Sequence, residues 1–245
     1  MLEEITTPQG IRPIDKEVFW DKTQTIISKS DLYGTIDYAN ETFADVSGYE
    51  EYELMGKPHN AVRHPDMPKI IFKMLWDALK KEEPFHVIAK NLAKSGRYYW
   101  VISDFEYIRD EQGKVINYLS KRDSIPQEVL DNHIIPLYRK LLLIEQASGL
   151  KYSEKYLIGF LEEKGVNFSD YVTGIMIDYI KKHDSVKKIG KIEIIKNPES
   201  EIKENENYGN KNILNNNFIL ETIEEEEEEE VERSGFFARF FGRRN

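Results

Sequence analysis

The chain has 245 residues, no cysteine and a formal net charge of −10, so disulfides, thiolate metal sites and cysteine nucleophiles are excluded. Residues 199–232 carry a net −11 and residues 233–245 carry +4, which leaves an ordinary −3 for residues 1–198. This balance gives no reason to expect a nucleic-acid partner. No aliphatic run is long enough to span a bilayer, and residues 1–13 lack the basic and apolar regions of a signal peptide. We therefore expect a cytoplasmic protein.

Short β-forming runs separated by turn residues predict a sheet domain over residues 22–124, preceded by an N-terminal arm at 1–21. The predicted strands are residues 25–28, 35–38, 85–91, 98–107 and 115–122. Short helical pieces and one longer helix lie between the second and third strands. This order predicts an α+β fold, with a five-stranded antiparallel sheet and helices on one face.

The motif Arg63-His64-Pro65-Asp66-Met67-Pro68 leads directly into that longer helix. Its two prolines stiffen the backbone, and Pro68 favours a helix start immediately after it. Residues 69–81 then repeat apolar side chains with helical period. The sequence therefore places a cation, an imidazole and a carboxylate at the N-terminus of a helix whose apolar face lines an apolar space.

Helices are predicted to follow the sheet domain. Residues 125–148 form a connecting helix that Pro136 should kink or divide, and residues 149–184 form a hairpin of helices at 153–164 and 168–182. The apolar stripe on the second of these helices is either packing within the hairpin or a partner-binding face.

Low-complexity sequence predicts that residues 185–232 are an acidic, disordered linker. Residues 233–245 combine four phenylalanines with four arginines. This basic, amphipathic tail is typical of a segment that contacts an anionic membrane surface or a partner groove, and an inert end is the alternative.

Several motifs in residues 22–142 resemble the flavin-binding PAS domain of aerotaxis receptors. The R-H-P-D-M-P sequence at 63–68 is the most specific of them, since it is not a general PAS feature. The others lie at residues 38–43, 47–49, 56–60, 76, 79–81, 83–84, 90–91, 99–101 and 136–138. Aerotaxis receptors carry a membrane anchor and a signalling region on the same chain. We find neither here, so the chain resembles a stand-alone PAS protein of a split energy-taxis system.

The resemblance implies FAD bound non-covalently, with Arg63, His64 and Asp66 needed for binding. It implies further pocket residues at Trp76, Asn40, Asn91 and Phe85, where Phe85 stands in place of the family's tryptophan. It also implies a redox sensor whose partner is a separate membrane chemoreceptor with a HAMP and signalling region. Such a protein would work in the cytoplasm at the inner face of the membrane, and a homodimer is compatible with the sequence.

The chemistry of these side chains agrees in part with FAD binding. Alternation along the strand at 85–91 places three apolar side chains and Asn91 on one face, and an amide can both donate to and accept from a ring edge. Arg63 suits a phosphate or a flavin carbonyl, and the pKa of His64 should lie near cytosolic pH. Structural roles remain open beside these: Asp66 and Asn40 can each cap a helix, and Trp76 can be core. His59 and His133 have no neighbours in the sequence that suggest chemistry.

Two other functions stay open at this stage. One is a haem-binding gas sensor with His64 or His59 as axial ligand, and the other is a cofactor-free PAS interaction module. An enzyme is not expected, because the sequence shows no phosphate loop, metal cluster or nucleophile–base pair. A blue-light receptor of the cysteinyl-flavin type is excluded by the missing thiol.

Overall fold

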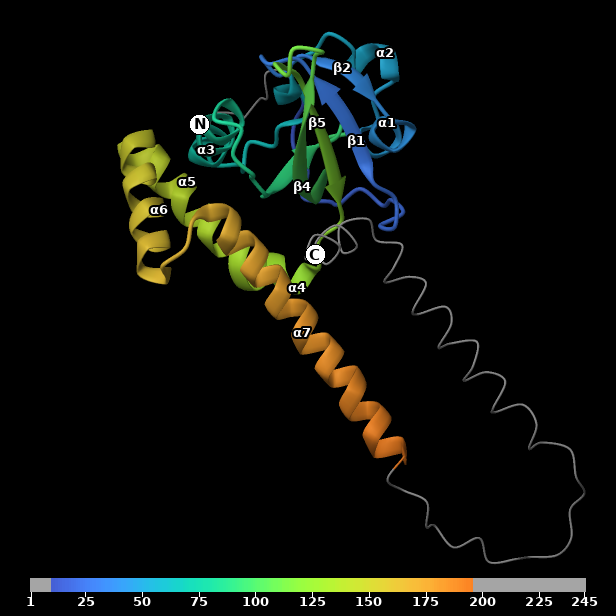
Figure 1. Ribbon diagram of the computed structural model, residues 1–245, viewed down its shortest axis with the longest axis vertical. Coiled ribbons are helices and arrows are strands. Elements are labelled where there is room, and N and C mark those ends of the chain that lie inside the picture. The colour runs from blue at the N-terminus through green and yellow to red at the C-terminus, as the bar shows by residue number, and fades with distance from the viewer. Residues whose placement is uncertain (1–9, 196–245) are drawn as a thin grey trace, which may run out of the picture. The chain divides into compact units, whose positions relative to one another are not determined.

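The computed structural model describes residues 10–195, and the side chains of residues 10–183. Five antiparallel strands form one sheet in the order β2-β1-β5-β4-β3, with β5 in the middle (Figure 1). This confirms the predicted α+β fold. The strands are β1 Ile26–Ser30, β2 Ile36–Ala39, β3 Val87–Leu92, β4 Tyr98–Arg109 and β5 Val115–Asp123.

Four helical segments connect β2 to β3: α1 Glu41–Ser47, α2 Glu51–Leu54, the 3-10 turn η1 His59–Val62, and α3 Lys69–Lys80. Asn40 caps α1 by accepting the Phe43 N–H, and Gly48 ends it in the left-handed conformation. The predicted helix at 69–81 corresponds to α3, whose apolar side chains are buried. These are Ile70, Ile71, Leu75, Ala78 and Leu79.

A second set of helices contacts β3 and β4 on the face of the sheet opposite the cavity. The chain continues through α4 Gln127–Val129, a π-helical segment η2 Leu130–Ile134 and α5 Ile135–Ser148. The π segment lies immediately before Pro136, so the predicted disturbance of this helix is a change in winding rather than a break. The Tyr138 hydroxyl of α5 donates to the Ile88 carbonyl at 2.6 Å, and its ring lies against Trp100.

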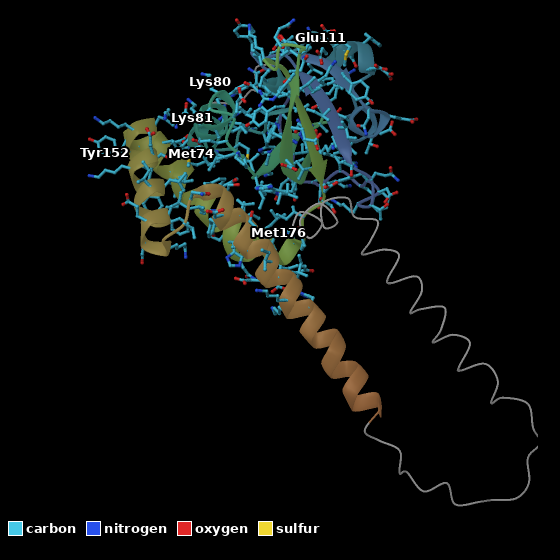
Figure 2. The ribbon with its side chains drawn as sticks, in the orientation of Figure 1. Met74, Lys80, Lys81, Glu111, Tyr152 and Met176 are labelled. Carbon is cyan, nitrogen blue, oxygen red and sulfur yellow. The ribbon has the colours of Figure 1, made fainter. Side chains whose placement is uncertain are left out.

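The hairpin helices are α6 Leu150–Lys164 and α7 Phe168–Ile195. Figure 2 shows Met74 on the side of α3 that faces α6, and Tyr152 on the outer side of α6. The described chain divides into two compact units at Met176. In the first unit, the predicted stripe on α7 is buried at Tyr171, Val172, Ile175 and Met176, which supports the packing interpretation for these residues.

Some predicted boundaries differ from the structure. α6 begins three residues before the predicted start at 153, and α7 continues to Ile195, so residues 185–195 are helical rather than part of a linker. The described part of the N-terminal arm docks on β4, where the Val18 N–H donates to the Tyr98 carbonyl at 2.8 Å. Residues 1–9, the remaining linker at 196–232 and the tail at 233–245 lie outside the described residues. No helix in the described 10–195 segment has the length and hydropathy needed to cross a membrane.

The N-terminus of α3 is capped by a residue from α5. Pro68 precedes α3 and makes no side-chain cap. Instead the Glu145 carboxylate accepts the backbone N–H groups of Lys69 and Ile70, both at 2.9 Å. The first N–H groups of a helix have no partner within it and attract negative charge. The Glu145 carboxylate therefore supplies both the missing hydrogen-bond acceptors and the negative charge. Of the two roles left open for Asp66, capping of α3 is therefore not the one that the structure shows.

We expect Glu145→Ala to lower the free energy of unfolding by about 1–2 kcal/mol, because two charge-assisted hydrogen bonds at a helix N-terminus are lost. Urea unfolding followed by circular dichroism would measure it. Gln146→Ala, one residue along α5 and exposed, is the matched control and should change stability little. Equal stability of the Glu145 variant and wild type would contradict the assigned cap.

Candidate functional site

A cavity of about 450 Å³ lies between α3 and the inner face of the sheet, which is the face turned toward α3. One wall is apolar and would hold a flat ring by contact alone. The apolar lining consists of Val62, Phe72, Leu75, Trp76, Leu79, Val87, Ala89 and Phe105. The exposed Tyr33 and Asn60 also line the cavity and mark its mouth.

The sheet side of the cavity also carries polar groups, although it is buried. Asn91, Ser103, Ser120 and Arg122 line it from β3, β4 and β5. The Ser120 hydroxyl is buried and has no hydrogen-bond partner among the described residues. Buried polar groups in folded proteins nearly always have partners, so this one fits an occupant with polar atoms at its edge. A planar ring with hydrogen-bonding edges, such as a flavin, matches both walls.

Arg63 and Asn91, two of the expected site residues, both line the cavity. Their backbones form an isolated antiparallel bridge between the motif and β3. The Arg63 guanidinium donates to the Met67 carbonyl at 2.9 Å and lies 4.5 Å from the Phe72 ring centre. Burial lowers the pKa of Arg63, and the charge of Glu145 opposes that shift. Arg63 therefore connects the cavity electrostatically to the residue that caps α3.

Trp76 also lines the cavity, where its ring meets Tyr118 edge-on with centroids 6.4 Å apart. Gly34 in the β1–β2 turn lies against this indole. A β-carbon at Gly34 would fall 2.8 Å from Trp76 Cη2, and Gly34 has φ +86°. Only glycine satisfies both the close approach and the left-handed backbone here.

His64 and Asp66 face a second hollow of about 900 Å³ on the other side of the motif, walled by Tyr98, Trp100 and Tyr138. His64 is buried, and its Nδ1 accepts the backbone N–H of Asp66 at 3.1 Å. The Asp66 carboxylate is largely exposed and pairs with Lys90 at 2.6 Å. Neither side chain lines the first cavity. His64 consequently does not face an occupant there, which weakens the haem alternative based on it.

Asn40 and Phe85 are not among the residues that line the cavity. The Asn40 amide makes two hydrogen bonds to the backbone at the start of β1. It accepts the N–H of Ile27 and donates to the Thr25 carbonyl, both at 2.9 Å. It therefore joins β1 to α1. Phe85 stacks on Phe168 with centroids 5.6 Å apart. Because β3 begins at Val87 rather than at residue 85, strand alternation does not carry Phe85 onto the inner face.

Most residues that line the cavity were not predicted as site residues, and His59 and Arg122 are two that matter for its chemistry. His59 was interpreted as structural except as a haem ligand, and Arg122 was not considered, yet both line the cavity. Arg122 Nη1 donates to Ser28 Oγ at 2.9 Å, and His59 Nε2 lies 3.0 Å from the same oxygen. Burial, then the Arg122 charge, holds the pKa of His59 well below its usual value. Strand alternation could have identified Arg122, because it places this residue on the same face of its strand as Tyr118 and Ser120.

The domain is α+β with a cavity between its sheet and α3, and residues 36–120 match the family model described as PAS fold. This part of the chain is a PAS domain. It is similar to the aerotaxis receptor of Escherichia coli strain K12, at 45% identity over 117 residues, or 48% of this chain and 23% of the receptor. The likeness makes it a PAS domain of the aerotaxis-receptor type.

Two further proteins are each similar to about half of this chain. The biofilm dispersion protein BdlA of Pseudomonas aeruginosa is 30% identical over 118 residues, covering 46% of this chain and 28% of that protein. A light-oxygen-voltage domain studied with a flavin analogue aligns with 48% of this chain and 89% of its own, at 22% identity and a TM-score of 0.43. The chain spans about a quarter of the length of the two curated relatives.

The buried His64 should make the protein less stable in acid. Burial, and next the charge of Lys90, lowers the pKa of His64 to about 4, while Asp66 and Asp15 oppose the shift. The unfolded chain therefore binds more protons between about pH 6.5 and 4, and the free energy of unfolding falls as pH falls through that window. Between these pH values the free energy of unfolding of His64→Gln should therefore fall by about 2–3 kcal/mol less than that of the wild type. Urea unfolding at several pH values would measure the difference.

The exposed His133 supplies the control for that measurement, and His133→Gln should follow the wild-type pH dependence. A His64→Gln protein that loses as much stability in acid as the wild type would contradict the buried, neutral imidazole.

Proposed function

We propose that the protein is a redox or energy sensor of the aerotaxis type, which binds FAD non-covalently in the cavity and signals to a separate membrane chemoreceptor. The observation that carries this proposal is the cavity itself: an apolar slot with a buried polar wall, inside a domain 45% identical to part of an aerotaxis receptor. A flavin supplies reversible electron uptake, with a change in charge and hydrogen bonding at its ring edge.

The residues around the cavity can hold such a ring in defined ways. Phe72, Trp76 and Leu79 provide apolar surface from α3, and Ala89 leaves room on the sheet side. The Asn91 amide can both donate and accept at the ring edge. The Arg63 guanidinium, already oriented by the Met67 carbonyl, offers further donors toward a carbonyl or phosphate. The Asn91 amide and the Arg63 guanidinium would respond to a change in the charge of the occupant.

The same residues offer a route from the cavity to the second set of helices. Arg63 senses the charge of Glu145, and Glu145 belongs to α5 while it caps α3. Glu145 also accepts from the Ser153 hydroxyl of α6 at 3.3 Å. A shift of Arg63 toward or away from the occupant would therefore change the charge balance at the junction of three helices.

The proposed partner is a chemoreceptor on another chain, and the support for it is that one relative is an aerotaxis receptor. Contact of residues 233–245 with an anionic membrane remains a prediction from the sequence. Deleting residues 233–245 and following the protein's distribution in cells tests it, and an unchanged distribution would refute the contact.

The visible absorption spectrum of the purified protein, before and after dithionite, tests the cofactor. We expect a two-banded flavin spectrum that bleaches on reduction. Ala89→Leu should lose most of the bound flavin because the longer side chain fills the slot, and Arg63→Ala should weaken binding about tenfold or more. Lys80→Ala, at the exposed end of α3 (Figure 2), is the control and should bind normally.

Other spectra would overturn the proposal. A sharp Soret band would indicate haem, with His59 as the histidine that lines the cavity. A colourless protein that takes up no added FAD would favour an interaction module without a cofactor.

A further inference from the structure

Three neighbouring strands place polar side chains at the centre of the inner face. Ser28 on β1 pairs with Ser120 on β5, and Arg122 on β5 pairs with Ser103 on β4. The four residues, here called the polar patch, are between 0% and 8% exposed. Buried positions of a sheet usually carry apolar side chains, because polar groups lose their water there. A polar patch in this place needs a polar partner.

Arg122 in particular lacks a negative partner among the described residues. Its guanidinium donates to Ser28 Oγ and lies 5.5 Å from the Phe43 ring centre, and both of these partners are uncharged. Burial lowers the pKa of Arg122 to about 10, so it stays charged at neutral pH. His59 shares Ser28 but cannot compensate, because it carries no negative charge in either protonation state. A buried, unpaired cation is among the most destabilising features a core can contain.

We propose that the polar patch is the subsite that receives an electron-rich ring edge of the bound cofactor, with Arg122 as its counter-charge and the Ser120 hydroxyl as a hydrogen-bonding group. This inference rests on the proposed flavin binding and adds the residues that orient the ring. Arg122 binds an occupant more tightly the more negative charge that edge carries. The site thereby favours one charge state of the cofactor over another.

The phosphates of FAD could offer the same negative charge, but the position of Arg122 favours the ring. Arg122 lies on β5, the central strand, with an exposed fraction of 8%. The mouth of the cavity is at Tyr33 and Asn60, and Tyr33 is 89% exposed. A flat ring enters the closed end readily, whereas a hydrated phosphate chain is better placed at the open end.

Fluorescence titration with riboflavin, FMN and FAD separates the two sources of charge. Arg122→Gln should weaken binding of all three about 10- to 100-fold, because riboflavin has the ring but no phosphate. Arg122→Lys, which keeps the charge, should recover part of the affinity. Arg109→Gln, an exposed arginine on β4, is the matched control. A loss confined to FMN and FAD would place the phosphate at Arg122 and overturn the inference, as would unchanged affinity for riboflavin.

The flavin-free protein gives an independent readout. Arg122→Met removes an unpaired buried charge, so its thermal unfolding temperature without flavin should equal or exceed that of the wild type, while the stabilisation by added flavin is lost. A much lower unfolding temperature would assign Arg122 to the fold and refute the subsite. Wild-type protein that binds none of the three flavins would refute the flavin proposal itself, whereas normal wild-type binding with an unaffected Arg122→Gln refutes only this inference.

Discussion

The bidentate contact of Glu145 with the start of α3 links this helix directly to α5. A proline-led helix cannot cap itself with the preceding residue, so its first N–H groups need an outside acceptor. Here that acceptor comes from α5, which packs on the opposite face of the sheet through Tyr138. The helix that closes the cavity and the helix that follows the domain therefore depend on one carboxylate.

The motif at 63–68 is divided between two spaces by the backbone that carries it. Arg63 faces the cavity, whereas His64 and Asp66 face the hollow on the other side, near Lys90 and the arm. Neighbouring residues in an extended segment point in opposite directions, so side chains that are close together in the sequence need not share a site. This division gives the motif a physical means to relate the state of the cavity to the outer surface.

The inner face of the sheet carries buried polar groups at a cost in stability. Serines and an arginine occupy positions where aliphatic side chains would pack better, and the Ser120 hydroxyl is left without a partner. Such groups destabilise a protein that has nothing to place against them. They are consistent with a cavity shaped for a polar edge, and they distinguish it from an ordinary hydrophobic core.

The sequence by itself determined the strands, the turns and α3, because alternation and helical period depend on local backbone geometry. The family resemblance pointed to Arg63, Trp76 and Asn91, and these three line the cavity. Only the tertiary structure decided that Glu145 caps α3 and that Arg122 lines the cavity, since the cap joins residues 75 or more positions apart. Such contacts leave no local periodic signal, because they arise only when distant segments pack together.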